Sequence, residues 1–465
     1  MFNLFYNKAF YLLIFIFFIS GCAGYAGKVS EMRTALSVGD KETAIKKVNE
    51  ALKVKEDDQY PDKLNSEKTL LINERGTIKQ SVDKFQSSAL DFRVADQNME
   101  LTDIKNDTVG SISKWIFSGS AGVYRAPPYE KMLLSTLNML NYLSVGNLED
   151  ARVEARRLDI TEHSLADENK ESDKALLGIG DYLSGFTFEM SGRYEQALQK
   201  YAEASQNNNY LSLNKLIPQL ANCTSYRDEL IDSIIEANPK SVEDGANPGC
   251  SAGSDKTGSL LVVTSSGLAP YKRANRLPIG AAVVLAGAFL TPVQLNQAND
   301  FAVKGLLKWV NFPDLVQSSP QFTKVSVSVD GTPVNIELGE NVSLLVKNYW
   351  EQIKGKLIAA AIVRMIARAV AGAGTNQAIK SASGDSGLGL LAQVLVEGAM
   401  TVADTPDTRT WNTLPAAFFL SRVELPAGEH NIKIDFFGNG KTVSVNKKIK
   451  ITSGGFTVIP VHTMR

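Results

Sequence analysis

The sequence predicts an α+β protein in which an N-terminal array of helical hairpins precedes a mixed domain with a small antiparallel β-sheet. From Lys28 to about Glu236, leucine and alanine recur every three or four residues, the period of an α-helix. Beyond residue 260, short apolar runs alternate with polar residues between glycine turns, the period of β-strands. Residues 238–259 are rich in Pro, Gly, Ser and Asp, which predicts a linker between a helical domain over 22–237 and a mixed domain over 260–465.

The overall composition is that of a globular protein. Hydrophobic residues make up 44% and charged residues 21% of the 465 residues, a balance that argues against extensive disorder. The formal net charge is −1. Because phosphate binding needs an excess of Lys and Arg, we expect no nucleic-acid partner.

The first 22 residues predict export and lipid anchoring. An apolar run over residues 9–19 is too short to cross a bilayer and is typical of a signal peptide, here residues 1–21. The tetrapeptide Ile-Ser-Gly-Cys that ends at Cys22 resembles the bacterial lipobox. The resemblance implies cleavage between Gly21 and Cys22 and attachment of two or three acyl chains, such as palmitate, at Cys22. An ordinary secretory signal is the alternative.

The residue after the lipobox cysteine predicts the membrane to which the protein is sorted. Ala23, in place of an aspartate, resembles the context that directs lipoproteins of Gram-negative bacteria to the outer membrane. We therefore expect a protein anchored in the outer membrane and facing the periplasm. No second membrane segment is predicted, because residues 279–290 are too few and residues 357–370 include two arginines.

The two other cysteines, Cys223 and Cys250, form an even pair once Cys22 carries lipid. An oxidising periplasm would permit a disulfide between them, with a loop-closure contribution of about 3.6 kcal/mol. Two free buried thiols are the alternative.

One helical segment resembles a tetratricopeptide (TPR) repeat. The positions that match lie between residues 181 and 205, namely Gly185, Phe188, Gly192, Tyr194, Ala197, Tyr201 and Ala204. In such a hairpin, small residues lie where the two helices approach closely, and aromatic rings fill the adjoining gap. A second copy matches at Tyr142, Gly146, Leu148, Ala151, Ala155 and Leu158, and a weaker third copy at Gly39, Ala44, Val48 and Ala51.

The resemblance to TPR repeats implies a surface that binds another protein. The alternative is a helical spacer whose grooves are filled by its own chain. Between the copies at 39–51 and 142–158, residues 111–128 are irregular and hold a Pro-Pro pair, and we expect this segment to pack over the helices rather than form a binding lip.

The second half is predicted as strands and helices in alternation. A strand is expected at 260–264, while residues 279–290 are apolar but ambiguous. Alternating valines predict a hairpin of 325–329 with 334–338 around an Asp-Gly turn. Helices are expected over 341–370 and 388–402, and a three-stranded meander over 432–436, 443–451 and 456–461.

The segment before the last strands is the strongest candidate for a site. It reads Asp407, Thr408, Arg409, Trp411, Leu414 and Pro415 at the positions of an Asp-Thr-Arg-x-Trp-x-x-Leu-Pro signature. With the lipobox and the TPR-like helices, this signature is similar to a family of uncharacterised proteobacterial lipoproteins, which implies a role in envelope assembly. Asp407 and Arg409 could form an ion pair with Trp411 stacked against it, and we favour such packing over the capture of a sugar or carboxylate.

The sequence offers no recognisable metal-binding or phosphate-binding pattern. Its three histidines lie far apart, and no phosphate-binding loop occurs. We therefore expect no cofactor, no metal and no enzymatic activity. The leading hypothesis is a lipoprotein that acts as a protein-binding scaffold or assembly factor in the cell envelope. The alternatives are binding of glycan or peptidoglycan by the C-terminal domain, and an envelope hydrolase with a site that sequence does not reveal.

Overall fold

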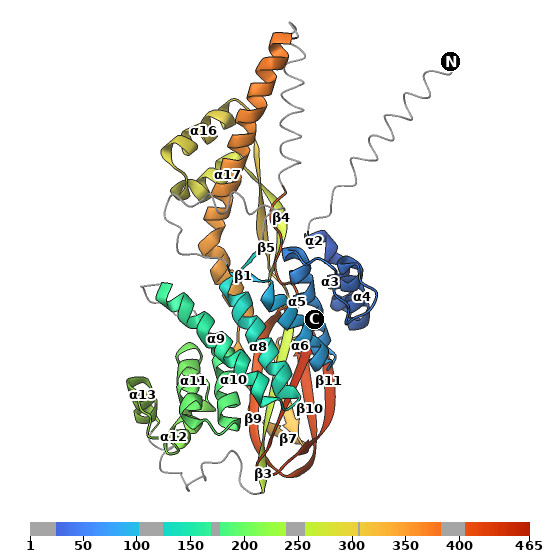
Figure 1. The fold of residues 1–465 in the computed structure, drawn as a ribbon, viewed down its shortest axis with the longest axis vertical. Coiled ribbons are helices and arrows are strands. Elements are labelled where there is room, and N and C mark those ends of the chain that lie inside the picture. The colour runs from blue at the N-terminus through green and yellow to red at the C-terminus, as the bar shows by residue number, and fades with distance from the viewer. Residues whose placement is uncertain (1–24, 102–123, 169–176, 239–255, 306, 383–404) are drawn as a thin grey trace, which may run out of the picture.

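The computed structural model describes residues 25–101, 124–168, 177–238, 256–305, 307–382 and 405–465. It confirms the α+β class, with helices in the first half and two antiparallel-rich sheets in the second (Figure 1). The signal peptide, Cys22, Cys250 and the helix predicted at 388–402 lie outside the described residues.

Helices in the first half pack as consecutive pairs joined by short turns. The pairs are α3 (Ser30–Val38) with α4 (Lys41–Leu52), α5 (Ser66–Ser81) with α6 (Phe85–Gln97), α8 (Pro128–Ser144) with α9 (Leu148–Glu168), and α10 (Gly178–Met190) with α11 (Tyr194–Asn207). The short helix α2 (Tyr25–Lys28) precedes them, and α12 (Leu213–Ala221) and α13 (Glu229–Ala237) follow. Each of the four turns contains one residue with a left-handed backbone, namely Gly39, Asp83, Gly146 and Gly192.

The TPR-like spacing corresponds to close packing between α10 and α11. A Cβ atom added to Gly185 would lie 2.6 Å from the ring of Tyr201, so only glycine fits at this crossing. Ala197, Tyr201 and Ala204 are fully buried, as the spacing predicts. Gly76 of α5 faces Phe92 of α6 in the same way, with 2.8 Å between the added Cβ and the ring.

Two four-stranded sheets form a sandwich in the second half. One sheet has the order β12-β3-β9-β8 and the other β11-β10-β6-β7. The strand bounds are β3 (Thr257–Leu268), β6 (Lys324–Val329), β7 (Thr332–Val334), β8 (Glu337–Glu340), β9 (Pro415–Pro426), β10 (Gly428–Gly438), β11 (Lys441–Ile451) and β12 (Phe456–Thr463). Strand β3 begins inside the segment predicted as a linker.

The hairpin predicted around the Asp-Gly turn was confirmed as far as β7, which pairs antiparallel with β6. The continuation of this hairpin to residue 338 was wrong, because β8 crosses to the other sheet and pairs with β9. The predicted meander ends after β11, because β12 joins the other sheet and runs parallel to β3. β3 and β12 are buried on both faces, so their apolar runs carry little alternation that would reveal the neighbouring strand.

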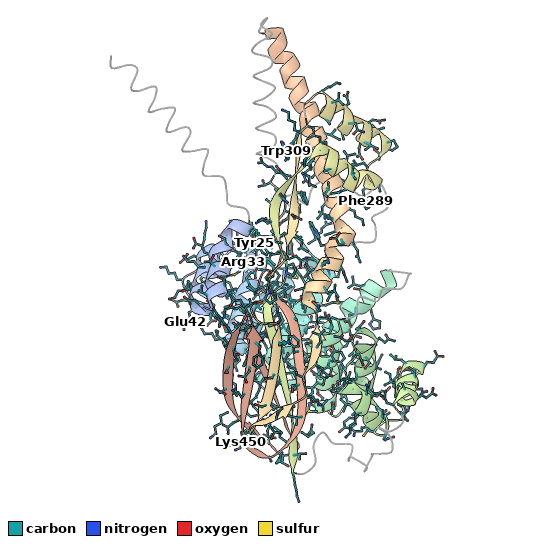
Figure 2. The ribbon with its side chains drawn as sticks, turned by 180° about the vertical axis from the view of Figure 1, so that it is seen from behind. Tyr25, Arg33, Glu42, Phe289, Trp309 and Lys450 are labelled. Carbon is teal, nitrogen blue, oxygen red and sulfur yellow. The ribbon has the colours of Figure 1, made fainter. Side chains whose placement is uncertain are left out.

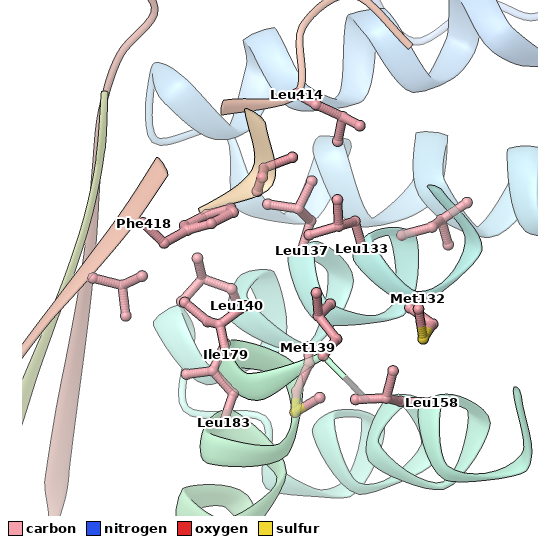
Figure 3. Close-up of a cluster of buried hydrophobic side chains, with 14 of the residues drawn as sticks. Met132, Leu133, Leu137, Met139, Leu140, Leu158, Ile179, Leu183, Leu414 and Phe418 are labelled. Carbon is pink, nitrogen blue, oxygen red and sulfur yellow. The ribbon is translucent and has the colours of Figure 1, made fainter. Parts of the chain in front are cut away.

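The helical layer and the sandwich share a core. On β3, Leu261 and Val263 pack among the helices, whereas Leu260 and Val262 point to the second sheet. Figure 3 shows Leu414 and Phe418 in one buried apolar cluster with side chains of α8, α9 and α10. Helices α5, α8 and α10 are consequently buried along most of their lengths, between their neighbouring helices and the chain's own second half.

An elongated arm projects from one end of this body (Figure 1). It consists of the strand pair β4 (Tyr271–Pro278) and β5 (Trp309–Val316), helices α15 (Ile279–Ala286) and α16 (Pro292–Val303) with a 3-10 turn, η1 (Gly287–Phe289), between them, and helix α17 (Val342–Ala382). The arm has its own apolar core, which α15, α16, β5 and α17 share. In the described part of the chain, no helix is long and apolar enough to cross a membrane.

Candidate functional site

The signature segment runs between the helical layer and the sandwich. Trp411 is 1% exposed and lies against Phe92 of α6, with 5.7 Å between ring centroids. Its indole N–H donates to the hydroxyls of Thr77 and Thr413, both at 3.0 Å. The ring is therefore fixed on its apolar face and at its polar edge.

Glu74, in the middle of α5, satisfies the backbone of this segment. Its carboxylate accepts hydrogen bonds from the backbone N–H groups of Asn412 at 2.7 Å and Thr413 at 2.8 Å, and from the Asn412 side chain at 3.0 Å. The hydroxyl of Tyr25 donates to the same carboxylate at 2.8 Å. Since the segment has no neighbouring strand, the glutamate supplies acceptors that a sheet would otherwise provide. Burial raises the pKa of Glu74, and these hydrogen bonds oppose that rise.

Glu130, in the first turn of α8, is a second buried carboxylate beneath the segment. It accepts from the Trp411 backbone N–H at 3.0 Å and from the Tyr124 hydroxyl at 2.5 Å. Burial raises its pKa to about 7, although these two hydrogen bonds and the charge of Lys272 favour the ionised form. We call Glu74, Glu130 and residues 407–415 the carboxylate clamp.

The predicted ion pair between Asp407 and Arg409 is present. The guanidinium Nε and Nη2 atoms lie 2.8 and 2.6 Å from the two carboxylate oxygens, so the pair is bidentate. The predicted stacking on Trp411 was wrong, since the Arg409 guanidinium lies over the ring of Tyr124, 5.5 Å from its centroid. Tyr124 occupies this position because its hydroxyl is held by Glu130.

These contacts direct the signature side chains inward. The Arg409 side chain is 4% exposed, Trp411 is 1% exposed, and only Asp407 reaches solvent in part. A soluble sugar or carboxylate would have to displace the segment before it could touch the indole. The arrangement holds layers together and presents no open binding surface at Trp411.

A second ion pair joins the helical layer to the sheet. Arg422 of β9 donates to both oxygens of Glu189 on α10, at 2.7 and 2.8 Å, and to the Tyr201 hydroxyl at 3.0 Å. The Tyr201 hydroxyl in turn donates to Glu189 at 2.7 Å. The aromatic residue of the TPR-like hairpin therefore packs against Gly185 and also contacts the sheet through a buried polar network.

A buried Ser–His pair lies elsewhere in the sandwich. Nδ1 of His462 on β12 is 2.5 Å from the Ser265 hydroxyl on β3, and both residues are almost fully buried. Burial, reinforced by the charge of Lys41, lowers the pKa of His462 to about 3. The imidazole is therefore neutral at pH 7 and has no access to a substrate in this structure.

Cys223 is disulfide-bonded. Its predicted partner, Cys250, lies outside the described residues. Within the described ranges, no group of three or more His, Cys, Asp and Glu side chains is arranged to hold a metal ion.

Sequence reasoning identified the signature but missed Glu74 and Glu130. Both lie in helices in which nearly every residue is buried, so a charged residue there requires buried partners. A glutamate in an otherwise buried helix was therefore the signal by which the sequence could have revealed these two residues. Comparisons with known proteins add no assignment, since no family model, curated protein or solved structure matches the chain.

Proposed function

We propose that this protein is a lipid-anchored lipoprotein of the bacterial outer membrane that acts as a scaffold or assembly factor in the cell envelope. The observation that carries the proposal is the way in which the chain joins the body immediately after the lipobox. Tyr25, three residues after Cys22, is 3% exposed, and its hydroxyl donates to Glu74 in the carboxylate clamp. Three extended residues span only about 10 Å, so an anchor at Cys22 would hold the body close to the bilayer.

The body suits a rigid platform because its buried charges join its layers. Glu74 and Glu130 hold the segment 407–415, and Arg422 ties the sheet to Glu189. These side chains form their hydrogen bonds and ion pairs within the chain, and none of them faces a cleft. We therefore propose a structural role and no catalytic one.

We propose that a protein partner binds elsewhere than in the inner groove that a TPR-like array would offer. Helices α5, α8 and α10 are covered by the protein's own sheet and by the carboxylate clamp. A protein partner would instead contact the outer helices, where Ile160 of α9 is 67% exposed. Binding of glycan through Trp411 is not proposed.

Two measurements test this proposal. Metabolic labelling with palmitate should mark the native protein and leave Cys22→Ser unlabelled; equal labelling of both would refute the anchor. In intact cells, a photo-cross-linking residue at Ile160 should yield the same envelope protein repeatedly. The same probe at Phe437 on the sandwich, 38% exposed, serves as the control. Adducts with peptidoglycan alone, or with nothing, would refute the scaffold.

A further inference from the structure

The arm exposes an apolar helix face that nothing in the described chain covers. Residues 279–290 contain no charged or polar side chain. One side of α15 packs inward through Ala282 and Ala286, while Val284 on the other side is 84% exposed and Leu285 47%. In the adjoining α16, Val303 is 88% exposed. A helix that is apolar on both its buried and its outer face is typical of a surface that leaves water when a partner binds.

The arm is also basic, which the overall charge of −1 conceals. Residues 271–316 and 342–368 contain ten Lys and Arg but only three Asp and Glu, a net charge of +7. Arg273 and Arg276 are exposed on β4, and Lys304 and Lys308 are exposed around the turn into β5. An apolar helix face bordered by cations matches the chemistry of an anionic lipid surface, where headgroup phosphates lie above the acyl chains.

The base of the arm lies beside the start of the described chain. The Arg33 guanidinium of α3 stacks on the ring of Tyr271, the first residue of β4, 3.4 Å from its centroid. Figures 1 and 2 both place α2 and the arm at the same end of the body. β4 has eight residues and extends about 26 Å from this contact to α15. With the arm lying along the bilayer surface, a lipid at Cys22 and the α15–α16 face would meet the same membrane.

We infer that the arm is a second membrane contact, which docks the outer face of α15 into an anionic lipid surface while the flanking Arg and Lys side chains reach the phosphates. The choice of membrane rests on the proposed anchoring at Cys22, whereas lipid binding itself does not. A second copy of the chain is the less suitable occupant, because two arms of charge +7 would repel each other.

The test uses the mature chain, residues 22–465, carrying Cys22→Ser and therefore no lipid. It is floated with vesicles of phosphatidylcholine alone, or with about 30% phosphatidylglycerol. We expect binding to the anionic vesicles only, and loss of binding as NaCl rises from about 0.1 to about 0.5 M. Val284→Glu should weaken binding about tenfold or more, because the exposed valine would no longer enter the apolar layer. Val38→Glu, a matched change at a 71% exposed valine on α3, should bind as the parent does.

Three results would overturn the inference. They are no binding to either vesicle, equal binding of Val284→Glu and Val38→Glu, and a dimer in solution that Val284→Glu dissociates without affecting vesicle binding. Because the tested chain carries no acyl group at residue 22, the vesicle assay is independent of palmitate labelling. Equal palmitate labelling of the native protein and Cys22→Ser, with intact vesicle binding, would refute only the anchor. Labelling that depends on Cys22, without vesicle binding, would refute only the arm.

Discussion

Truncation of Trp411 tests whether the signature segment holds the layers together. Trp411→Ala removes a 1% exposed indole from the core between α6, the segment and the sheet, together with its hydrogen bonds to two threonine hydroxyls. Large-to-small changes of aromatic residues at such sites cost about 3–5 kcal/mol. For a chain of this length, a loss of about 4 kcal/mol corresponds to a melting temperature lower by about 4 °C, if the body unfolds as one unit.

Trp309→Ala is the matched control, because Trp309 is 45% exposed at the end of β5. It should cost about 1 kcal/mol or less, measured by urea unfolding beside Trp411→Ala. If the two variants unfold at the same urea concentration, Trp411 is not the core residue described here. Sedimentation with purified sacculi separates stability from binding. A native-like Trp411→Ala protein that lost sacculus binding would favour glycan recognition and refute the packing role.

Three further predictions concern packing and charge. Gly185→Ala should cost about 1–3 kcal/mol of unfolding free energy because its Cβ would overlap the ring on α11, whereas Gly280→Ala, with open space around it, should be neutral or slightly stabilising. Arg422→Met alone should cost about 3–5 kcal/mol, and adding Glu189→Leu should recover part of that loss, as a double-mutant cycle would measure. Burial raises the pKa of Glu130 from 4.5 to about 7, so the folded state binds the extra proton between these values and its stability falls as pH rises through them, by up to about 3 kcal/mol. Because burial also raises the pKa of Glu154, Glu162 and Glu340 to about 7, Glu130→Gln should remove only its own share of the stability difference between pH 5 and pH 7 in urea unfolding, and an unchanged difference would contradict the assignment.

The helical repeats were predictable where local spacing alone decides the packing. Gly185 and Tyr201 are sixteen residues apart, and the same interval separates Gly76 from Phe92 in the pair α5–α6. That pair was missed because Asp83 replaces glycine in the turn and a serine replaces alanine at the close approach. Asp83 adopts the left-handed backbone with φ of +62°, so the hairpin forms despite the substitution.

Strand pairing was less predictable because its partners are remote. β10 and β11 are adjacent in sequence, and their Gly-Asn-Gly turn identified the hairpin correctly. β12 pairs with β3, nearly two hundred residues earlier, and no local feature of either strand specifies the other. Burial on both faces is the property that they share, and it becomes visible only when the helical layer is in place.

In the carboxylate clamp, too, short-range contacts were predictable from the sequence and long-range contacts were not. Asp407 and Arg409 are two residues apart, so their ion pair could be predicted from the sequence. The hydrogen bonds of Glu130 to Trp411 and of Glu74 to Asn412 span 281 and 338 residues. Such contacts need the fold, although a glutamate within a continuously buried helix already signals that a buried donor must lie opposite it.

The clamp brings together helix α2 at the start of the described chain, the signature segment and the base of the arm. Tyr25 and Asn412 share the Glu74 carboxylate, and Arg33 donates to the Asn412 side chain at 3.2 Å while it stacks on Tyr271 at the base of the arm. An apolar core could stabilise the same layers, yet it would fix neither the direction of α2 nor that of β4. Hydrogen bonds to the Glu74 carboxylate fix α2 through Tyr25, and Arg33 connects Asn412 to the first residue of β4. A shifted register would leave the donors of Asn412 unpaired at a cost of about 1–3 kcal/mol each. The clamp therefore fixes α2 and the base of the arm relative to each other, and the proposed contact of α15 with a membrane anchored through Cys22 depends on this arrangement.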